Sequence, residues 1–355
     1  MTRKRHEHSE NLVERVFKGH REEGPVCSSP LVTVTLEQMR TSGFFYPTAH
    51  TDPRAMAMLS SFVFTYIGFQ GIRVPFDLCV EAEAFGCKVR KGDNSSPPLV
   101  IEKAFEERDS LLVPENIFQK GRFEVVFEAI RILNNKFGNE VTIFPGMVGP
   151  LTLVGFLYDT STVMRWPIKD QQRLDHNLEK AADFLTEYAN RLSESGGNVL
   201  AILDPTASGD LLSRKYFERH MMPIYQRMRE NIQKPIVLHI CGNTTGFLDL
   251  LPATGFEAFS FEAPEVSVSM ARQEMGDNMV LVGNIPTYDI LLFGTPDKVR
   301  EESLTALKEG VDVLAPACGV PVQTPSENLR AMVRAVEEFR GNSENRGILN
   351  QASSL

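Results

Sequence analysis

The sequence predicts an α/β protein folded as a (β/α)8 TIM barrel with extra helices at its N-terminus. Eight short apolar or β-branched runs end at Gly, Pro, Asn or Asp and alternate with segments whose apolar residues recur at helical spacing. Alternating strands and helices form a parallel sheet, and eight such units close most economically into a barrel. A doubly wound open sheet is the competing fold, but no G-x-G-x-x-G or G-x-x-x-x-G-K-[ST] motif follows the first run.

The predicted strands are residues 31–35, 71–74, 141–144, 199–203, 236–239, 258–261, 280–282 and 313–315. The predicted helices between and after them are residues 121–136, 174–195, 215–231, 295–309 and 326–339. Asp170 and Ser326 stand near the starts of two of these helices, where a side-chain oxygen can accept hydrogen bonds from free N–H groups. Two earlier helices, at residues 11–18 and 55–66, are expected to lie against one mouth of the barrel.

Composition indicates an ordinary globular protein, with 42% hydrophobic and 23% charged residues among 355. A net charge of −9 offers no basic surface, so nucleic acid is not expected as a partner. The five cysteines are scattered and odd in number, which predicts no disulfide framework and a reducing, cytoplasmic location. No apolar run reaches 18 residues, and the first ten residues lack the apolar core of a secretory signal. We therefore expect neither a membrane span nor secretion.

No internal repeat or linker divides the chain. The expected organisation is an arm and helix at residues 1–24, a barrel domain at 25–340 and a flexible tail at 341–355, which is rich in Asn, Ser and Gly. His6 and His8 in the arm could bind a metal, but a polar arm is the favoured interpretation. A homodimer is compatible with all of these features.

Three residues with side chains that suit zinc lie far apart in the sequence. His239 and Cys241 form an H-x-C motif, and Cys318 follows in a second segment. Sites with three protein ligands usually keep a fourth position open for water or substrate, and two thiolates with an imidazole favour zinc over magnesium or calcium. H-x-C alone is a weak motif, because buried cysteines are often only small hydrophobic residues. However, all three follow predicted strands, so the sequence predicts a metal centre that takes part in chemistry.

Other polar residues also follow the predicted strands, where the catalytic groups of such barrels gather. The predicted positions are Asp77, Gly146, Asp204, Glu262 and Asn284 at the ends of five different strands. A single carboxylate such as Asp204, which precedes a proline, is as readily explained as a loop cap. Their joint arrival at one mouth favours an active site there.

Five segments also resemble a known family. They are VLHICGNTT at 237–245, VGNIPTYDILLFGTP at 282–296, LAPACG at 314–319, VEAEAFGC at 80–87 and DPTAS at 204–208. Together they resemble the methylcobamide:coenzyme M methyltransferases, a branch of the uroporphyrinogen decarboxylase superfamily of barrels, over residues 32–339. The resemblance implies zinc at His239, Cys241 and Cys318, and methyl transfer from the methylated corrinoid (methylcobalamin) of a corrinoid protein to a thiol such as coenzyme M.

Within this interpretation, Glu262 is expected as the fourth zinc ligand or as a partner of His239. It forms the predicted catalytic group with Asp204, Asp77 and Asn284, and the predicted corrinoid-binding residues are Asn243, Gly146 and Gly283. Asp77 would bring a negative charge to a pocket for an anionic sulfonate, so tetrahydrofolate stays open as the acceptor.

Three further alternatives remain. The methyl donor could be a methoxyaromatic compound or a methylamine, or the chain could be a corrinoid-binding module without catalysis. Uroporphyrinogen decarboxylation is disfavoured, because residues 29–45 contain no counterpart of the arginine-rich R-Q-A-G-R-Y stretch of the decarboxylases.

Overall fold

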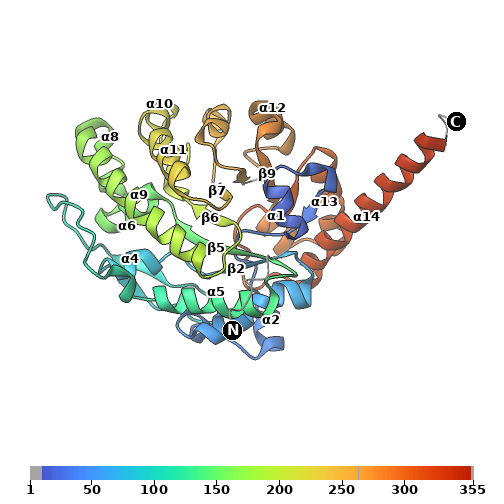
Figure 1. Cartoon of the computed structure of the whole chain (residues 1–355), viewed down its shortest axis with the longest axis horizontal. Helices are drawn as coiled ribbons and strands as arrows, with labels where there is room; N and C mark the ends of the chain where they lie inside the picture. The colour runs from blue at the N-terminus through green and yellow to red at the C-terminus, as the bar shows by residue number, and fades with distance from the viewer. Residues whose placement is uncertain (1–9, 263, 353–355) are drawn as a thin grey trace, which may run out of the picture.

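Eight parallel strands curl into a barrel in the computed structural model, which describes residues 10–262 and 264–352 (Figure 1). Around the barrel the strands follow the order β1-β10-β9-β8-β7-β6-β5-β2. At the seam between the two ends of this order, the backbone N–H of Gln70 donates to the carbonyl oxygen of Cys27 at 2.9 Å. The predicted barrel is therefore confirmed. His6 and His8 lie outside the described residues.

The barrel strands are β1 (Val26–Cys27), β2 (Gly71–Val74), β5 (Thr142–Val148), β6 (Leu200–Leu203), β7 (Ile236–Ile240), β8 (Ala258–Phe261), β9 (Val280–Ile285) and β10 (Val313–Pro316). The helices are α1 (Leu12–Phe17), α2 (Leu36–Ser42), α3 (Pro53–Phe62), α4 (Val80–Ala84), α5 (Phe123–Phe137), α6 (Pro150–Tyr158), α7 (Thr160–Val163), α8 (Trp166–Lys169), α9 (Gln171–Glu194), α10 (Arg214–Tyr216), α11 (Met222–Asn231), α12 (Val268–Met275), α13 (Pro296–Lys308) and α14 (Ser326–Ala352). None of the helices in the described part of the chain is long and apolar enough to cross a membrane.

Alternate residues of each strand face the barrel interior and the surrounding helices. Along β6, Ala201 and Leu203 belong to the interior cluster, whereas Leu200 and Ile202 pack with the outer layer. Helix α1 closes the N-terminal end of the barrel. Its Phe17 packs edge-on against the ring of Phe144, with the two ring centres 5.5 Å apart. Thus α1 covers one mouth as expected, and the opposite mouth is left for a functional site.

The helix predicted at 55–66 does not cover a mouth. It corresponds to α3 and the π-helical turn Val63–Ile67, which pack beside α5 and β2 in the outer layer. That part of the prediction is wrong, because the chain needs a helix on the outside of the barrel between β1 and β2.

The first predicted strand, at residues 31–35, is also wrong. The first barrel strand is β1, a two-residue strand whose Val26 and Cys27 pair with Val313 and Leu314 of β10. Residues 31–35 instead cross the open mouth, where the backbone N–H of Val320 donates to the carbonyl of Val32 at 3.0 Å. These residues, several of them β-branched, are buried by the loops around the mouth and not by a sheet. Their composition is therefore typical of a buried strand, although they do not form one.

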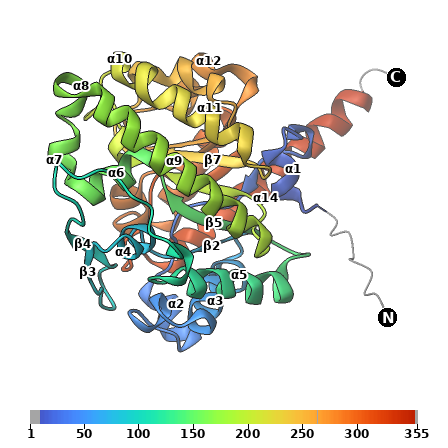
Figure 2. The same cartoon turned by 60° about the vertical axis from the view of Figure 1, so that its left-hand side comes forward.

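Two insertions build up the rim of the open mouth. A separate antiparallel hairpin of β3 (Lys88–Arg90) and β4 (Leu99–Glu102) follows α4 (Figure 2). The chain after it is tied to α6, because the backbone N–H groups of Ala104 and Phe105 both donate to the carbonyl of Leu157. Neither β3 nor β4 was predicted from the sequence, because short exposed strands show little periodicity of apolar residues.

Both predicted N-cap residues stand at helix starts. The side chain of Asp170 accepts a hydrogen bond from the backbone N–H of Arg173 and caps α9, as predicted. Ser326 is the first residue of α14, and its hydroxyl lies 3.5 Å from that of Thr35. Helix α14 continues through the predicted tail to Ala352 and extends away from the barrel (Figures 1 and 2). The flexibility of residues 341–355 stays a prediction.

Candidate metal centre

An apolar cavity of about 360 Å³ opens at the carboxyl ends of the strands. His239 enters it from β7, Cys241 from the turn that follows, and Cys318 from the loop after β10. Leu31 and Val34 from the loop that crosses the mouth supply apolar wall. Such a volume suits a small molecule rather than a polymer. The three predicted metal ligands therefore share one small cavity at the catalytic end of the barrel.

The donor atoms of these three residues lie within 4.8 Å of one another. His239 Nε2 is 3.1 Å from Cys241 Sγ, and Cys241 Sγ is 3.7 Å from Cys318 Sγ. Zn–S bonds of 2.3 Å at tetrahedral angles would place two sulfurs about 3.8 Å apart, and a nitrogen and a sulfur about 3.6 Å apart. The two thiols thus stand at the separation of two ligands of one zinc ion, far beyond the length of a disulfide. The donor set fits zinc in its chemistry and in the separation of its two sulfurs, whereas His239 Nε2 and Cys241 Sγ, at 3.1 Å, stand closer than two ligands of one zinc ion.

The imidazole of His239 is held by Ser260 on the neighbouring strand β8. Its Nδ1 lies 3.0 Å from Ser260 Oγ, which leaves Nε2 directed at Cys241. His239 is 2% exposed, so its ring cannot reorient through solvent. An outer partner of this kind fixes the orientation of a metal-binding imidazole. Ser260 was missed in the sequence, although it stands two residues before Glu262 and so shares its strand face.

Glu262, which its place at the end of β8 led us to expect near the metal, contacts the turn that carries Cys241 but is not one of the three clustered donors. Its Oε2 accepts a hydrogen bond of 2.7 Å from the backbone N–H of Gly242, the residue after Cys241. Burial raises the pKa of Glu262, although the hydrogen bond from Gly242 acts in the opposite direction. This contact orients the turn that carries Cys241 and leaves the second carboxylate oxygen for another partner.

The sulfurs of Cys241 and Cys318 are close enough to form a hydrogen bond. The hydrogen bond between them lowers the pKa of Cys318 well below its ordinary value and raises that of Cys241. His239 lowers the pKa of Cys318 further. A thiolate is the form of cysteine that binds metals. These contacts therefore favour the metal-binding thiolate form of Cys318.

Asp77 also lines the cavity, but its negative charge is neutralised. Arg122 donates to both of its oxygens at 2.8 Å, and His50 Nδ1 lies 3.0 Å from Oδ2. Burial by itself would raise the pKa of Asp77, yet the hydrogen bonds from Arg122 and His50 hold it well below its usual range. This arrangement removes the electrostatic conflict between Asp77 and an anionic acceptor that the sequence alone suggested.

Asp204 does not line the cavity; its backbone N–H donates to the carbonyl of His239 at 2.9 Å, but its carboxylate bonds to other residues. It is fully buried under the start of α6, where it accepts hydrogen bonds from the backbone N–H and the hydroxyl of Thr152 and from the Tyr225 hydroxyl. Burial raises the pKa of Asp204, and these donors oppose the shift. The carboxylate thus caps α6 from the neighbouring strand, so we propose a positioning role rather than the predicted catalytic one.

The remaining predicted site residues lie outside the cavity wall. Asn284 donates from Nδ2 to the carbonyl of Val266 at 2.9 Å, and Gly283 precedes it in β9. Asn243 is exposed and accepts from Thr245, within the turn after Cys241. Gly146 lies inside β5, where a Cβ atom would overlap the guanidinium of Arg73, only 1.0 Å from Nη1. The structure therefore does not gather Asn284, Gly283, Asn243 and Gly146 around the metal-type donors, and their roles stay predictions.

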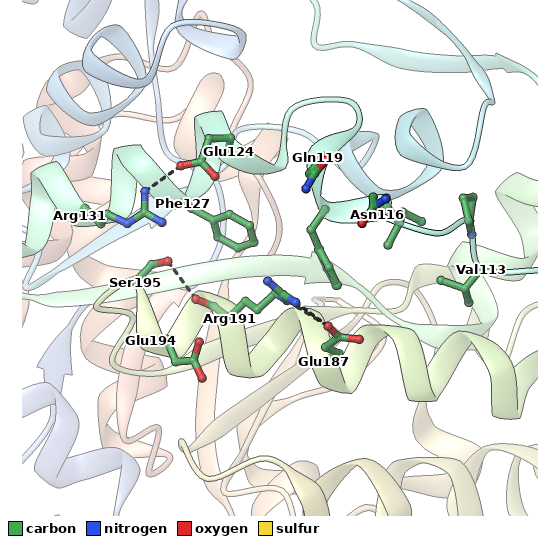
Figure 3. Close-up of a pocket in the computed structure, with 13 residues that line it drawn as sticks. Val113, Asn116, Gln119, Glu124, Phe127, Arg131, Glu187, Arg191, Glu194 and Ser195 are labelled. Atoms are coloured by element: carbon green, nitrogen blue, oxygen red, sulfur yellow. Dashed lines mark hydrogen bonds and ion pairs between the residues drawn. The ribbon is translucent and has the colours of Figure 1, made fainter.

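A second cleft lies on the outer surface between α5 and α9 (Figure 3). Its charged residues are paired with one another: Arg131 with Glu124 at 2.8 Å, and Arg191 with Glu187 at 2.8 Å. The guanidinium of Arg191 also lies over the ring of Phe118, 4.3 Å from its centre. Both arginines of the cleft already have carboxylate partners, so we assign this cleft no function.

The sequence and structure were compared with known proteins. The family model described as uroporphyrinogen decarboxylase (URO-D) matches residues 8–339. Methylcobamide:CoM methyltransferase MtaA of Methanosarcina barkeri is 37% identical over 318 residues, 89% of this chain and 93% of its own. MtbA of Methanosarcina acetivorans, also named a methylcobamide:CoM methyltransferase, is 34% identical over 92% of this chain and 98% of its own. A solved methyltransferase from Methanosarcina mazei superposes with a TM-score of 0.88 at 35% identity, over 92% of this chain and 98% of that one.

The fold and the site together define a barrel enzyme with a sulfur-rich metal-type centre at its catalytic mouth. The chain belongs to the uroporphyrinogen decarboxylase (URO-D) family, and it is a methyltransferase. A uroporphyrinogen decarboxylase of Trichodesmium erythraeum is only 23% identical over 70% of this chain. A B12-independent methionine synthase from a Shewanella species, with a TM-score of 0.61 at 15% identity, shares the fold.

The position of Asp204 yields a prediction about stability. We expect Asp204→Ala to lower the free energy of unfolding by about 3 kcal/mol, because it leaves the backbone N–H of Thr152 and the buried hydroxyl of Tyr225 without acceptors. The matched control is Asp52→Ala, which removes the exposed N-cap of α3 and should cost about 1 kcal/mol. Urea unfolding measures both losses. An Asp204→Ala protein as stable as the wild type, but without activity, would restore the catalytic assignment.

Proposed function

We propose that this methyltransferase moves a methyl group from a methylated corrinoid, carried by a corrinoid protein, to a small thiol such as coenzyme M. The supporting observation is the cluster of His239, Cys241 and Cys318 in a cavity of about 360 Å³, with two sulfurs 3.7 Å apart. The names of the relatives in Methanosarcina supply the donor and the acceptor. We propose Zn²⁺ as the metal, because two thiolates and an imidazole favour it.

His239, Cys241 and Cys318 would hold the zinc ion, with one coordination position left for substrate. Zinc bound there would supply the positive charge that keeps an entering thiol in its thiolate form. Ser260 keeps the His239 imidazole in place, and Glu262 steadies the turn that carries Cys241. The apolar walls exclude water, so the sulfur nucleophile is less hydrated than it would be in solution.

The transfer is a substitution at the methyl carbon of the donor. A lone pair of the thiolate sulfur forms the new S–C bond while the Co–C bond breaks. The electron pair of that bond stays on cobalt, which goes from Co(III) to Co(I), and the proton of the thiol passes to solvent. The corrinoid carries out the organometallic step, and the barrel contributes position and charge.

The direct test is a methyl-transfer assay with free methylcobalamin and coenzyme M. We expect the absorption of methylcobalamin to change as methyl coenzyme M accumulates, and we expect a zinc chelator to stop the reaction. Tetrahydrofolate serves as the competing acceptor in a parallel reaction. Transfer to tetrahydrofolate alone would contradict the thiol assignment. Binding of the corrinoid with no transfer to either acceptor would instead indicate a binding module.

Glu262 supplies a second prediction for this reaction. We expect Glu262→Gln to lower the rate of thiol methylation about 10- to 100-fold, the usual loss for an outer partner of a metal site. Initial rates and zinc content should be measured on the same preparation. The control is Glu265→Gln, a change of an exposed carboxylate on the same loop. A Glu262→Gln enzyme with the wild-type rate would make this carboxylate an ordinary loop residue.

A further inference from the structure

One arginine is buried inside the barrel without a counter-ion. Arg73 of β2 is 3% exposed and lines the same cavity as the metal-type donors. Its guanidinium makes one hydrogen bond in the structure, from Nη1 to the carbonyl of Val74 at 3.1 Å, and Nε is buried without any partner. Burying a charge in this way is costly unless it is paired. The cost suggests that a ligand supplies the missing partner.

No carboxylate of the described residues takes that place. Asp77 is fully engaged by Arg122 and His50, and Oε1 of Glu81 accepts from the backbone N–H of Val148. Neither acid forms an ion pair with Arg73 within the described ranges; both act on it only through longer-range electrostatics. Burial lowers the pKa of Arg73 to about 10, so its guanidinium keeps its positive charge at neutral pH.

The backbone is shaped to admit this arginine. The guanidinium of Arg73 occupies the space that a side chain at position 146 would fill, and Gly146 leaves that space open. Gly146 belongs to β5, the strand that pairs with β2. The predicted corrinoid-binding role of Gly146 stays a prediction, and its neighbour in the structure is the guanidinium of Arg73.

A second donor without a partner lines the same cavity. The hydroxyl of Tyr46 is buried and makes no hydrogen bond, while its ring stacks on His50 with the ring centres 4.4 Å apart. Burial raises the pKa of Tyr46 well above its ordinary value, so its hydroxyl stays protonated and can donate. Two unused donors in one apolar cavity, one of them cationic, are complementary to an anion with several acceptor oxygens.

The strand order places Arg73 across the cavity from the histidine. Going around the barrel, β7 with His239 stands three places from β2 with Arg73, and β10, which precedes Cys318, stands two places away on the other side. A ligand that reaches both groups must span the cavity with a thiol at one end and an anion at the other. The cavity volume of about 360 Å³ limits it to a short molecule.

We propose that Arg73 and Tyr46 form an anion subsite that selects a short thiol with an anionic tail as the methyl acceptor. This inference rests on the proposed methyl transfer to a thiol, and it assigns the residues that recognise the anionic tail of the acceptor. Coenzyme M, 2-sulfanylethanesulfonate, has this form: two carbons separate its thiol from a sulfonate with three acceptor oxygens. Arg73 and Tyr46 act as specificity-determining residues that touch the substrate away from the reacting sulfur.

The kinetic test compares coenzyme M with neutral 2-sulfanylethanol, which has a thiol on the same two-carbon chain. The wild type should prefer coenzyme M by about 100-fold in kcat/KM, since charge-assisted hydrogen bonds in buried sites are strong. Arg73→Met should lose this preference, because kcat/KM should fall far more for coenzyme M than for 2-sulfanylethanol. Arg73→Lys should keep part of the preference, and Tyr46→Phe should reduce it about 10-fold. Arg131→Met, in the outer cleft of Figure 3, is the charge-removing control and should change neither rate.

A binding measurement makes the test independent of turnover. Propane-1-sulfonate has the shape of coenzyme M without its thiol, so calorimetry should detect its binding to the wild type and not to Arg73→Met. The melting temperature of Arg73→Met should equal or exceed that of the wild type, because the change removes a buried unpaired charge. A purely structural arginine would instead lower it.

The outcomes separate this inference from the proposed function. If the wild type methylates both thiols equally, or fails to bind propane-1-sulfonate, the subsite is wrong while thiol methylation stands. If Arg73→Met retains the full preference for coenzyme M, the subsite is likewise wrong. If the wild type binds propane-1-sulfonate through Arg73 but methylates neither thiol, the subsite stands and the proposed function fails.

Discussion

Replacing Cys318 with alanine is expected to remove the bound zinc and to lower methyl transfer to thiols by more than about 100-fold. Loss of an outer partner of a metal site costs up to about 100-fold, and loss of a direct ligand should cost more. Cys318 provides one of two sulfurs at ligand spacing, and its pKa is already lowered by the hydrogen bond with Cys241. The remaining imidazole and thiol form an incomplete site. Cys241→Ala should have the same effect for the same reason. Elemental analysis and the methylcobalamin assay measure the two losses on one preparation.

Cys87 offers the matched control. It is a buried free cysteine whose sulfur lies near the carbonyl of Phe156, outside the group of metal-type donors. Cys87→Ala should therefore keep one zinc per chain and the wild-type rate. Full zinc content in both Cys241→Ala and Cys318→Ala would show that the metal centre is misassigned. Full zinc loss with unchanged methyl transfer would separate the metal from the reaction.

Seven of the eight strands were predictable because a barrel strand buried on both faces is a continuous apolar run. The run at 258–261 coincides with β8, and the run at 71–74 coincides with β2. β1 was not predicted, because a strand of two residues has no periodic pattern. The neighbouring run at 31–35 was predicted as a strand instead, because loops bury its apolar residues. The helix predicted at 215–231 contains a π-helical turn before α11. The spacing of apolar residues in the sequence does not predict this turn.

The metal-type donors were predictable because metal binding depends on residue type. Cysteine and histidine at the ends of barrel strands indicate a site for a soft metal ion. The environment of a carboxylate is not predictable in this way. Asp77 and Asp204 look alike in sequence, yet one is paired with an arginine 45 residues away and the other caps a helix. Likewise, Arg73 stands out as a charge within an apolar strand, but only the folded chain reveals that it has no counter-ion.

The pairing of Arg122 with Asp77 leads to the largest expected change in stability. Arg122→Met should lower the free energy of unfolding by about 3–5 kcal/mol at pH 7, because it leaves the carboxylate of Asp77 buried without its cationic partner, with only His50 and the backbone N–H of Cys79 in contact. Arg122 also contacts Glu83, but that carboxylate is 34% exposed and contributes little. The control Arg131→Met breaks only exposed ion pairs and should cost less than about 1 kcal/mol.

The loss in Arg122→Met should shrink as the pH falls. In the wild type the pKa of Asp77 is lower in the folded than in the unfolded state, so its contribution to stability is present above the unfolded pKa and disappears as the pH falls toward the folded pKa. Without Arg122, burial raises the pKa of Asp77, and the folded variant takes up a proton as the solution becomes acidic. The stability difference between the two proteins should therefore be largest near pH 7 and smaller near pH 4. Urea unfolding at both pH values measures it. A difference that is the same at both would mean that Arg122 stabilises the fold through packing and not through the charge of Asp77.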